Sequence, residues 1–97
     1  MEHIDQFVFT AVICKERRGY TSLCLELDVA SQGDTAQEAR NALLEAVTLY
    51  LETAFESNVP YLRPVPAETN PLLQKALAKS VVETTRLKVD FAIHAHV

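Results

Sequence analysis

The chain has 97 residues, of which 48% are hydrophobic and 23% charged, and it carries a formal net charge of −4 at pH 7. That balance predicts one ordinary globular domain over residues 1–97. The negative charge argues against direct nucleic-acid binding, which depends on a basic surface, and it favours a basic protein partner. The polar start of the chain and the lack of a long apolar run predict neither a secretion signal nor a membrane span, and hence a cytoplasmic protein.

Three strands are expected before the first helix. Residues 6–15, QFVFTAVICK, form a β-branched and aromatic run that is apolar on both faces, as is typical of a strand inside a sheet. A polar turn that ends in Gly19 leads to a second strand over residues 20–27, and residues 29–32 form a short third strand. The turn predicts that the first two strands pair as a hairpin.

The two cysteines lie on these first two strands. If the hairpin turns at residues 17–18, Cys14 lies opposite Thr21 and Cys24 lies opposite Ala11. The two thiols are then out of register and on opposite faces of the sheet, so we expect no disulfide. Neither cysteine belongs to a CxxC pattern, and we expect no metal site there.

A corner of Gly33, Asp34 and Thr35 is expected between the third strand and a helix. Glycine permits a positive φ at such a corner, and Thr35 with Glu38 forms the S/T-x-x-E capping box. In that box the hydroxyl accepts from the Glu38 N–H, and the carboxylate accepts from the Thr35 N–H. Asp34 adds negative charge near the positive end of the helix dipole. We interpret these residues as a helix-cap corner and not as a catalytic site.

The helix is expected over residues 36–57. Its apolar stripe is widened by Val47 and Leu51 and consists of Ala39, Ala42, Leu43, Ala46, Tyr50 and Ala54. The opposite stripe is acidic, and its candidate partner-facing residues are Glu38, Glu45 and Glu52. This stripe is either an ordinary solvated helix face or a negative surface that steers a basic partner.

Residues 58–85 are expected to form a proline-containing connector that holds one short helix, from Pro71 to about Val82. Residues 86–97 alternate apolar and polar side chains and predict a closing strand. One long helix covers only one face of a small sheet, so the second helix or another chain must cover the other face. Another chain would make the protein a homodimer or a tetramer, with a candidate oligomer surface of Phe7, Phe9 and Ile13.

The order strand, turn, strand, SQGDT corner (residues 31–35) and helix, with Glu38 and Ala39 after the corner, resembles the HicB family of antitoxins over about residues 7–52. The resemblance implies an α+β, truncated RNase H-like fold (β-β-β-α-(α)-β), in which a three-stranded antiparallel meander precedes the helix and a fourth strand lies beside the first. It also implies a partner, a small basic RNA-cleaving toxin of the HicA type, which the protein neutralises by occlusion. Members that repress their own operon carry a DNA-binding segment after the last strand. This chain lacks one, so we expect no DNA binding.

A minimal or degenerate nuclease of the RNase H type is one alternative, and a solitary homo-oligomer with an unidentified ligand is another. Metal-dependent cleavage needs several converging carboxylates, whereas the first strand has no acid between residues 7 and 14, and Glu26 and Asp28 are the only candidates on the next two strands. His94 and His96 have a spacing that can chelate zinc, but a remote His3 is the only other histidine. We therefore expect no catalytic residue, no metal and no cofactor.

Overall fold

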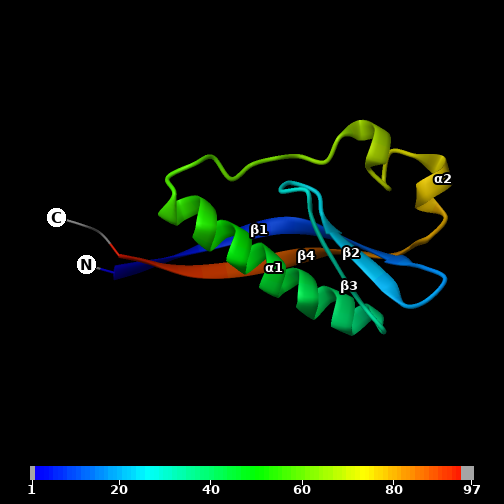
Figure 1. The fold of residues 1–97 in the computed structure, drawn as a ribbon, viewed down its shortest axis with the longest axis horizontal. Coiled ribbons are helices and arrows are strands. Elements are labelled where there is room, and N and C mark those ends of the chain that lie inside the picture. Colours follow the sequence, from blue (N-terminus) through cyan, green and yellow to red (C-terminus); the bar gives the residue numbers. More distant parts are fainter. Residues whose placement is uncertain (1, 95–97) are drawn as a thin grey trace.

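The computed structural model describes the backbone of residues 2–94 and the side chains of residues 6–90. Four antiparallel strands form one sheet in the order β3-β2-β1-β4, and a long helix lies across one face (Figure 1). The elements are β1 Glu2–Lys15, β2 Tyr20–Cys24, β3 Val29–Gly33, α1 Ala36–Glu56, the 3-10 helix η1 Ala67–Thr69, α2 Lys75–Ala78 and β4 Val81–His94. The predicted α+β layout, with the fourth strand beside the first, is confirmed.

β1 lies inside the sheet, as its two apolar faces indicate, with β2 on one side and β4 on the other. Its register with β2 places Ala11 opposite Cys24 and Cys14 opposite Thr21. The predicted positions of both cysteines are therefore confirmed, and both thiols are free and buried. Burial raises the pKa of Cys24 to about 11 and also raises the pKa of Cys14, so neither thiol is a ready nucleophile at neutral pH.

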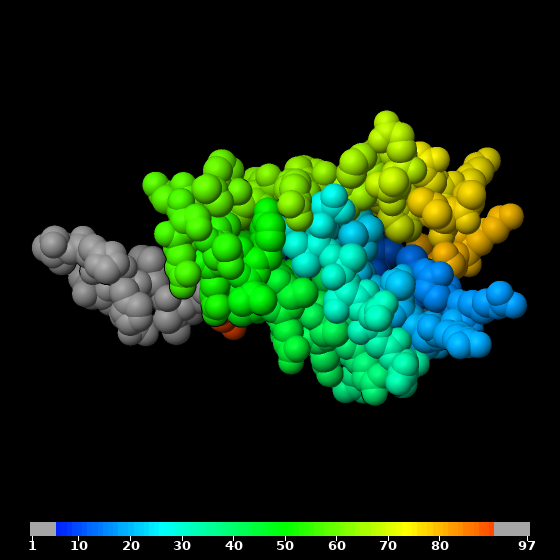
Figure 2. Space-filling view, in the orientation of Figure 1, coloured from blue at the N-terminus to red at the C-terminus, as the bar shows by residue number. Residues whose placement is uncertain are grey.

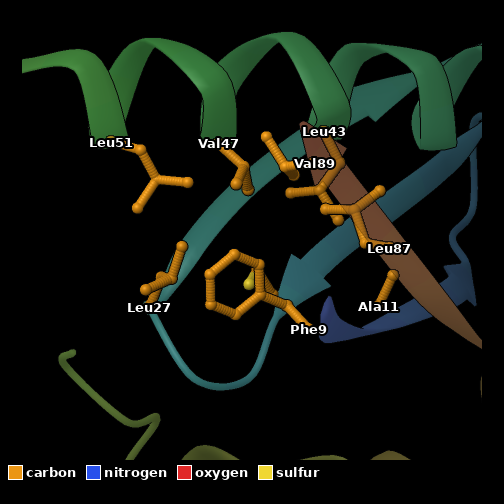
Figure 3. Close-up of a cluster of buried hydrophobic side chains, with 9 residues drawn as sticks. Phe9, Ala11, Leu27, Leu43, Val47, Leu51, Leu87 and Val89 are labelled. Atoms are coloured by element: carbon orange, nitrogen blue, oxygen red, sulfur yellow. The ribbon is translucent and has the colours of Figure 1, made fainter. Parts of the chain in front are cut away.

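The core lies between α1 and the inner face of the sheet (Figure 3). Leu43, Val47 and Leu51 of α1 are fully buried and point toward the sheet. Val47 and Leu51 therefore lie at the centre of the buried stripe and not at its margin, whereas Tyr50 is only half-buried. The sheet and the turn after β2 complete the cluster with Phe9, Ala11, Cys24, Leu27, Leu87 and Val89.

Three strands extend beyond the bounds that their sequence patterns predict, and β2 is shorter. β1 begins at Glu2 because the backbone of β4 pairs with it as far as His94. β2 ends at Cys24 and not at residue 27, because residues 25–28 form a turn in which Asp28 has a φ of 53°. The short third strand is confirmed and extends to Gly33.

The predicted short second helix is confirmed, but it covers fewer residues than the predicted range from Pro71 to about Val82. Residues 71–73 form a turn, and α2 is a single turn of helix over Lys75–Ala78. The carboxamide of Asn70 accepts from the Leu72 N–H at 2.9 Å, which favours the turn. β4 then begins at Val81 and not at residue 86, because the sequence VVETT is rich in the β-branched residues that strands favour.

The segment between α1 and β4, residues 57–80, is called the connector below. It runs lengthwise past the turn between β2 and β3, as the green-to-yellow chain against the cyan turn in Figure 2 shows. The N–H groups of Arg63 and Val65 donate to the carbonyls of Glu26 and Leu25 at 2.9 and 2.8 Å. These bonds attach residues 63–65 of the connector, which lie outside any helix, to the turn.

The connector covers one end of the outer sheet face, the face opposite α1. Val12 and Cys14 point to this face and are buried, and within the connector Val65 and Pro71 are buried as well. Val8, farther along the same face of β1, is 48% exposed. The chain thus closes part of this face by itself. Over residues 2–94, no helix is long and apolar enough to cross a membrane.

Candidate functional site

The helix-cap corner positions the start of α1. The Glu38 N–H donates to Oγ1 of Thr35 at 3.1 Å, and the Asp34 N–H donates to Oε2 of Glu38 at 2.8 Å. The first bond is as predicted, whereas the second goes to the N–H of Asp34 and not to that of Thr35. The corner therefore satisfies backbone donors at the helix start, which is a structural role.

The glycine of this corner is needed for a different reason from the one predicted. Positive φ belongs to Gly19, at 87°, and not to Gly33. At Gly33 a Cβ atom would lie 2.6 Å from both the Ala39 nitrogen and the Cβ of Glu38. The residue is small because the first turn of α1 packs directly against the end of β3.

A shallow hollow of about 390 Å³ lies between this corner and the turn after β1. Two of its carboxylates already accept hydrogen bonds within the chain: Glu38 accepts from the Asp34 N–H, and Glu16 accepts from the hydroxyl of Thr21 at 3.0 Å. The other residues that line it are Arg18, Tyr20, Gln32 and Gly33. We assign this hollow no ligand.

Glu26, one of the two acids that the nuclease alternative requires, serves the fold with both carboxylate oxygens. Oε1 accepts from the Thr10 N–H at 2.7 Å, and Oε2 accepts from the Thr10 hydroxyl at 2.8 Å. The carboxylate thus replaces the strand partner that β1 loses where β2 turns away. Asp28 lies in the same turn and is exposed, so the two acids are on a turn and not on two strands.

No group of three or more His, Cys, Asp or Glu side chains that could hold a metal ion is found where the structure describes side chains. The side chains of His3 and His94 lie outside that part, and His96 lies outside the described backbone as well. The zinc interpretation of these histidines stays a sequence-based prediction.

The three residues expected to form an oligomer surface lie on the face of β1 that α1 covers. Phe9 is 5% exposed, and Ile13 is fully buried. Phe7 is half-buried and packs with Phe55 and Tyr61, whose ring centroids are 5.7 and 5.8 Å from its own. These side chains build the core and its aromatic margin, so a surface for another chain must lie elsewhere.

The acidic stripe of α1 is open to solvent. Glu38, Glu45 and Glu52 are all exposed on the side of α1 away from the sheet. Within residues 6–90, neither Glu45 nor Glu52 forms a hydrogen bond or an ion pair. Arg40, the single basic residue of α1, instead pairs with Glu83 of β4.

Leu49 adds an apolar residue to this stripe. It follows Glu45 by four positions and precedes Glu52 by three, which places all three side chains on one helix face. Its side chain is 64% exposed, as high a fraction as any large apolar side chain among those described. Sequence reasoning missed Leu49, although a leucine at an acidic stripe position was a readable signal. The surface formed by Glu38, Glu45, Leu49 and Glu52 is called the α1 acidic face below.

Comparisons of the chain with protein-family models, with curated proteins and with solved structures found no match. The α1 acidic face combines exposed glutamates with an exposed leucine. The side chains of Thr35 and Glu38 in the corner, and that of Glu26, form hydrogen bonds within the chain.

Proposed function

We propose that the protein is an antitoxin-like interaction module of the HicB type, which acts in the cytoplasm. It neutralises a small basic RNA-cleaving toxin by covering the toxin surface that engages RNA. It needs no cofactor, performs no catalysis and does not bind DNA. The observation that carries this proposal is the α1 acidic face, where exposed glutamates surround an exposed leucine.

Charge and apolar surface contribute differently to such a contact. Glu45 and Glu52, which form no ion pair within residues 6–90, leave a negative field that accelerates encounter with a basic protein, and this acceleration weakens as salt is added. Leu49 can be removed from water at the centre of the contact, where apolar anchors contribute most of the affinity. The rim of glutamates then sets the choice of a basic partner.

The experiment uses the small basic protein encoded by the adjacent reading frame, mixed with the full chain and studied by titration calorimetry. Glu45→Lys and Leu49→Asp should each weaken binding at least tenfold, about 1.4 kcal/mol. Glu68→Lys, a charge reversal of an exposed acid on η1, is the matched control and should change the affinity less than twofold. Binding that all three variants weaken equally, or that none weakens, would contradict the assignment of this face.

Inhibition gives a second readout of the same proposal. The purified chain should suppress RNA cleavage by that partner at equimolar concentration and should cleave no RNA itself with Mg²⁺ or Mn²⁺. Metal-dependent cleavage by this chain that Glu26→Gln abolishes would instead support the nuclease alternative, because Glu26 would then act beyond its contact with Thr10.

A further inference from the structure

β4 ends the sheet on one side and runs the length of the molecule. The strand order β3-β2-β1-β4 leaves its outer edge unpaired over Val81–His94, as far as the described residues extend. Figure 1 shows β4 along the border of the sheet, continuing with β1 beyond the end of α1. A long open strand edge is a template for pairing with another chain.

The hydrogen bonds of Thr10, on the other side of β1, show which residues of β4 direct their backbone groups toward this edge. The Thr10 N–H and carbonyl point toward the turn after β2, where they bond to Glu26 and Leu25. In an antiparallel ladder, a residue that points away from its partner strand faces a residue that also points away. Arg86 faces Thr10, so its N–H and carbonyl point outward from the sheet. The same holds for every second residue, namely Thr84, Lys88 and Asp90.

The other open stretch of backbone, on the β2 side of β1 near Gln6 and Val8, is a poorer candidate. The connector runs beside it, and Tyr61 packs on Phe7 there. β4 has no such neighbour on its outer side in the described part of the chain, so it is the edge that a second strand can reach.

We infer that the protein forms a symmetric homodimer in which β4 pairs antiparallel with β4 of a second copy, centred on Val89. Because outward-facing residues must pair with outward-facing residues, only alternate registers are allowed. The register centred on Val89 sets Lys88 opposite Asp90 of the other copy, twice. It leaves no like charges opposite each other among Arg86, Lys88 and Asp90.

The other registers centred on a residue from Arg86 to Asp90 all place like charges together. Pairing centred on Arg86, Lys88 or Asp90 sets each of these residues against its own copy, and pairing centred on Leu87 sets Arg86 against Lys88. Like charges directly opposite on one sheet face are destabilising, whereas opposite charges are stabilising. Gln6 donates to Oδ1 of Asp90 at 3.1 Å within the chain, and Oδ2 remains for the second copy.

This arrangement is compatible with the proposed function but does not depend on it. Pairing about a two-fold axis perpendicular to the sheet keeps both copies of α1 on the same face of one continuous sheet. The α1 acidic faces stay open, because they lie on the side of the helix away from the sheet. The dimer buries a strand edge, and the partner binds a helix.

The test measures mass by light scattering of the full chain at micromolar concentration. We expect a dimer of the 10.8 kDa chain. Lys88→Asp and Asp90→Lys should each raise the dimer dissociation constant at least tenfold, because each creates two like-charge pairs. The double variant K88D/D90K restores opposite charges and should restore the dimer. A monomeric wild-type chain, or single variants that dimerise as well as wild type, would overturn the inference.

A backbone substitution tests the edge independently of charge. Arg86→Pro removes an outward N–H, which an edge strand tolerates without loss of its own sheet. It should give a folded monomer, while Arg86→Ala stays dimeric. A dimer that survives Arg86→Pro with unchanged affinity would exclude the β4 edge. Binding of the basic partner by the Arg86→Pro chain tests the proposed function separately, because the α1 acidic face does not depend on the dimer.

Discussion

On the inner face of the sheet, α1 lays Leu43 and Leu51 over Phe9 in one continuous cluster. On the outer face, an extended connector covers the end near Val12 and leaves Val8 half open. The inner face is closed by apolar contacts at helical spacing, whereas the outer face is closed by hydrogen bonds from a connector without a long helix. The difference predicts that stability depends on side-chain packing on one face and on a few polar contacts on the other.

The largest expected effect is on the inner face. Leu43→Ala removes a fully buried side chain and leaves a cavity, so the free energy of unfolding should fall by about 2–5 kcal/mol. Leu73→Ala makes the same chemical change in the connector, where the side chain is 64% exposed, and should change stability by less than about 0.5 kcal/mol. Urea denaturation followed by circular dichroism measures both. Similar losses for the two variants would show that the connector packs far more tightly than the structure indicates.

The inner face was largely predictable from the sequence because it is built from regular patterns. Helical spacing indicated α1, the capping residues indicated its start, and the two-faced apolar run indicated that β1 is central. The register of the cysteines followed from the turn alone. Each of these is a local signal with a fixed geometric period, so the sequence is sufficient to read it.

The outer face and the surfaces were less predictable, because their contacts join segments far apart in the chain. Nothing near Glu26 shows that its carboxylate binds Thr10, and nothing near Val65 shows that its N–H reaches Leu25. The helix predicted from Pro71 to about Val82 was too long for the same reason: its apolar spacing was readable, but pairing with β1 takes the residues from Val81 onward into a strand. The sequence also did not show that α1 buries Phe9 and Ile13, which leaves these side chains unavailable to an oligomer surface.

A smaller effect is expected where the outer face depends on a polar contact. Glu26→Ala leaves the Thr10 N–H and hydroxyl without their acceptor, and should lower the free energy of unfolding by about 1–3 kcal/mol. Glu68→Ala is the exposed control and should be nearly neutral. In a double-mutant cycle, Thr10→Val should cost less when Glu26 is already absent, because the hydroxyl no longer has a partner to lose. Additive effects would mean that the carboxylate does not hold β1.

The smallest effect compares the two cysteines, one on each face. Burial raises the pKa of Cys24 from an ordinary value of 9.0 to about 11, so the folded chain keeps a proton that the unfolded chain releases. Stability from this group is fully present below pH 9 and is lost as pH rises toward 11, by about 1.4 kcal/mol for each pH unit. Cys24→Ala should flatten this alkaline slope more than Cys14→Ala, because Cys14 is less completely enclosed, at 8% exposed against full burial for Cys24. Urea titrations between pH 8.5 and about 10.5 measure the slopes. Equal flattening by both variants would mean that the connector excludes water from the outer face as well as α1 does from the inner one.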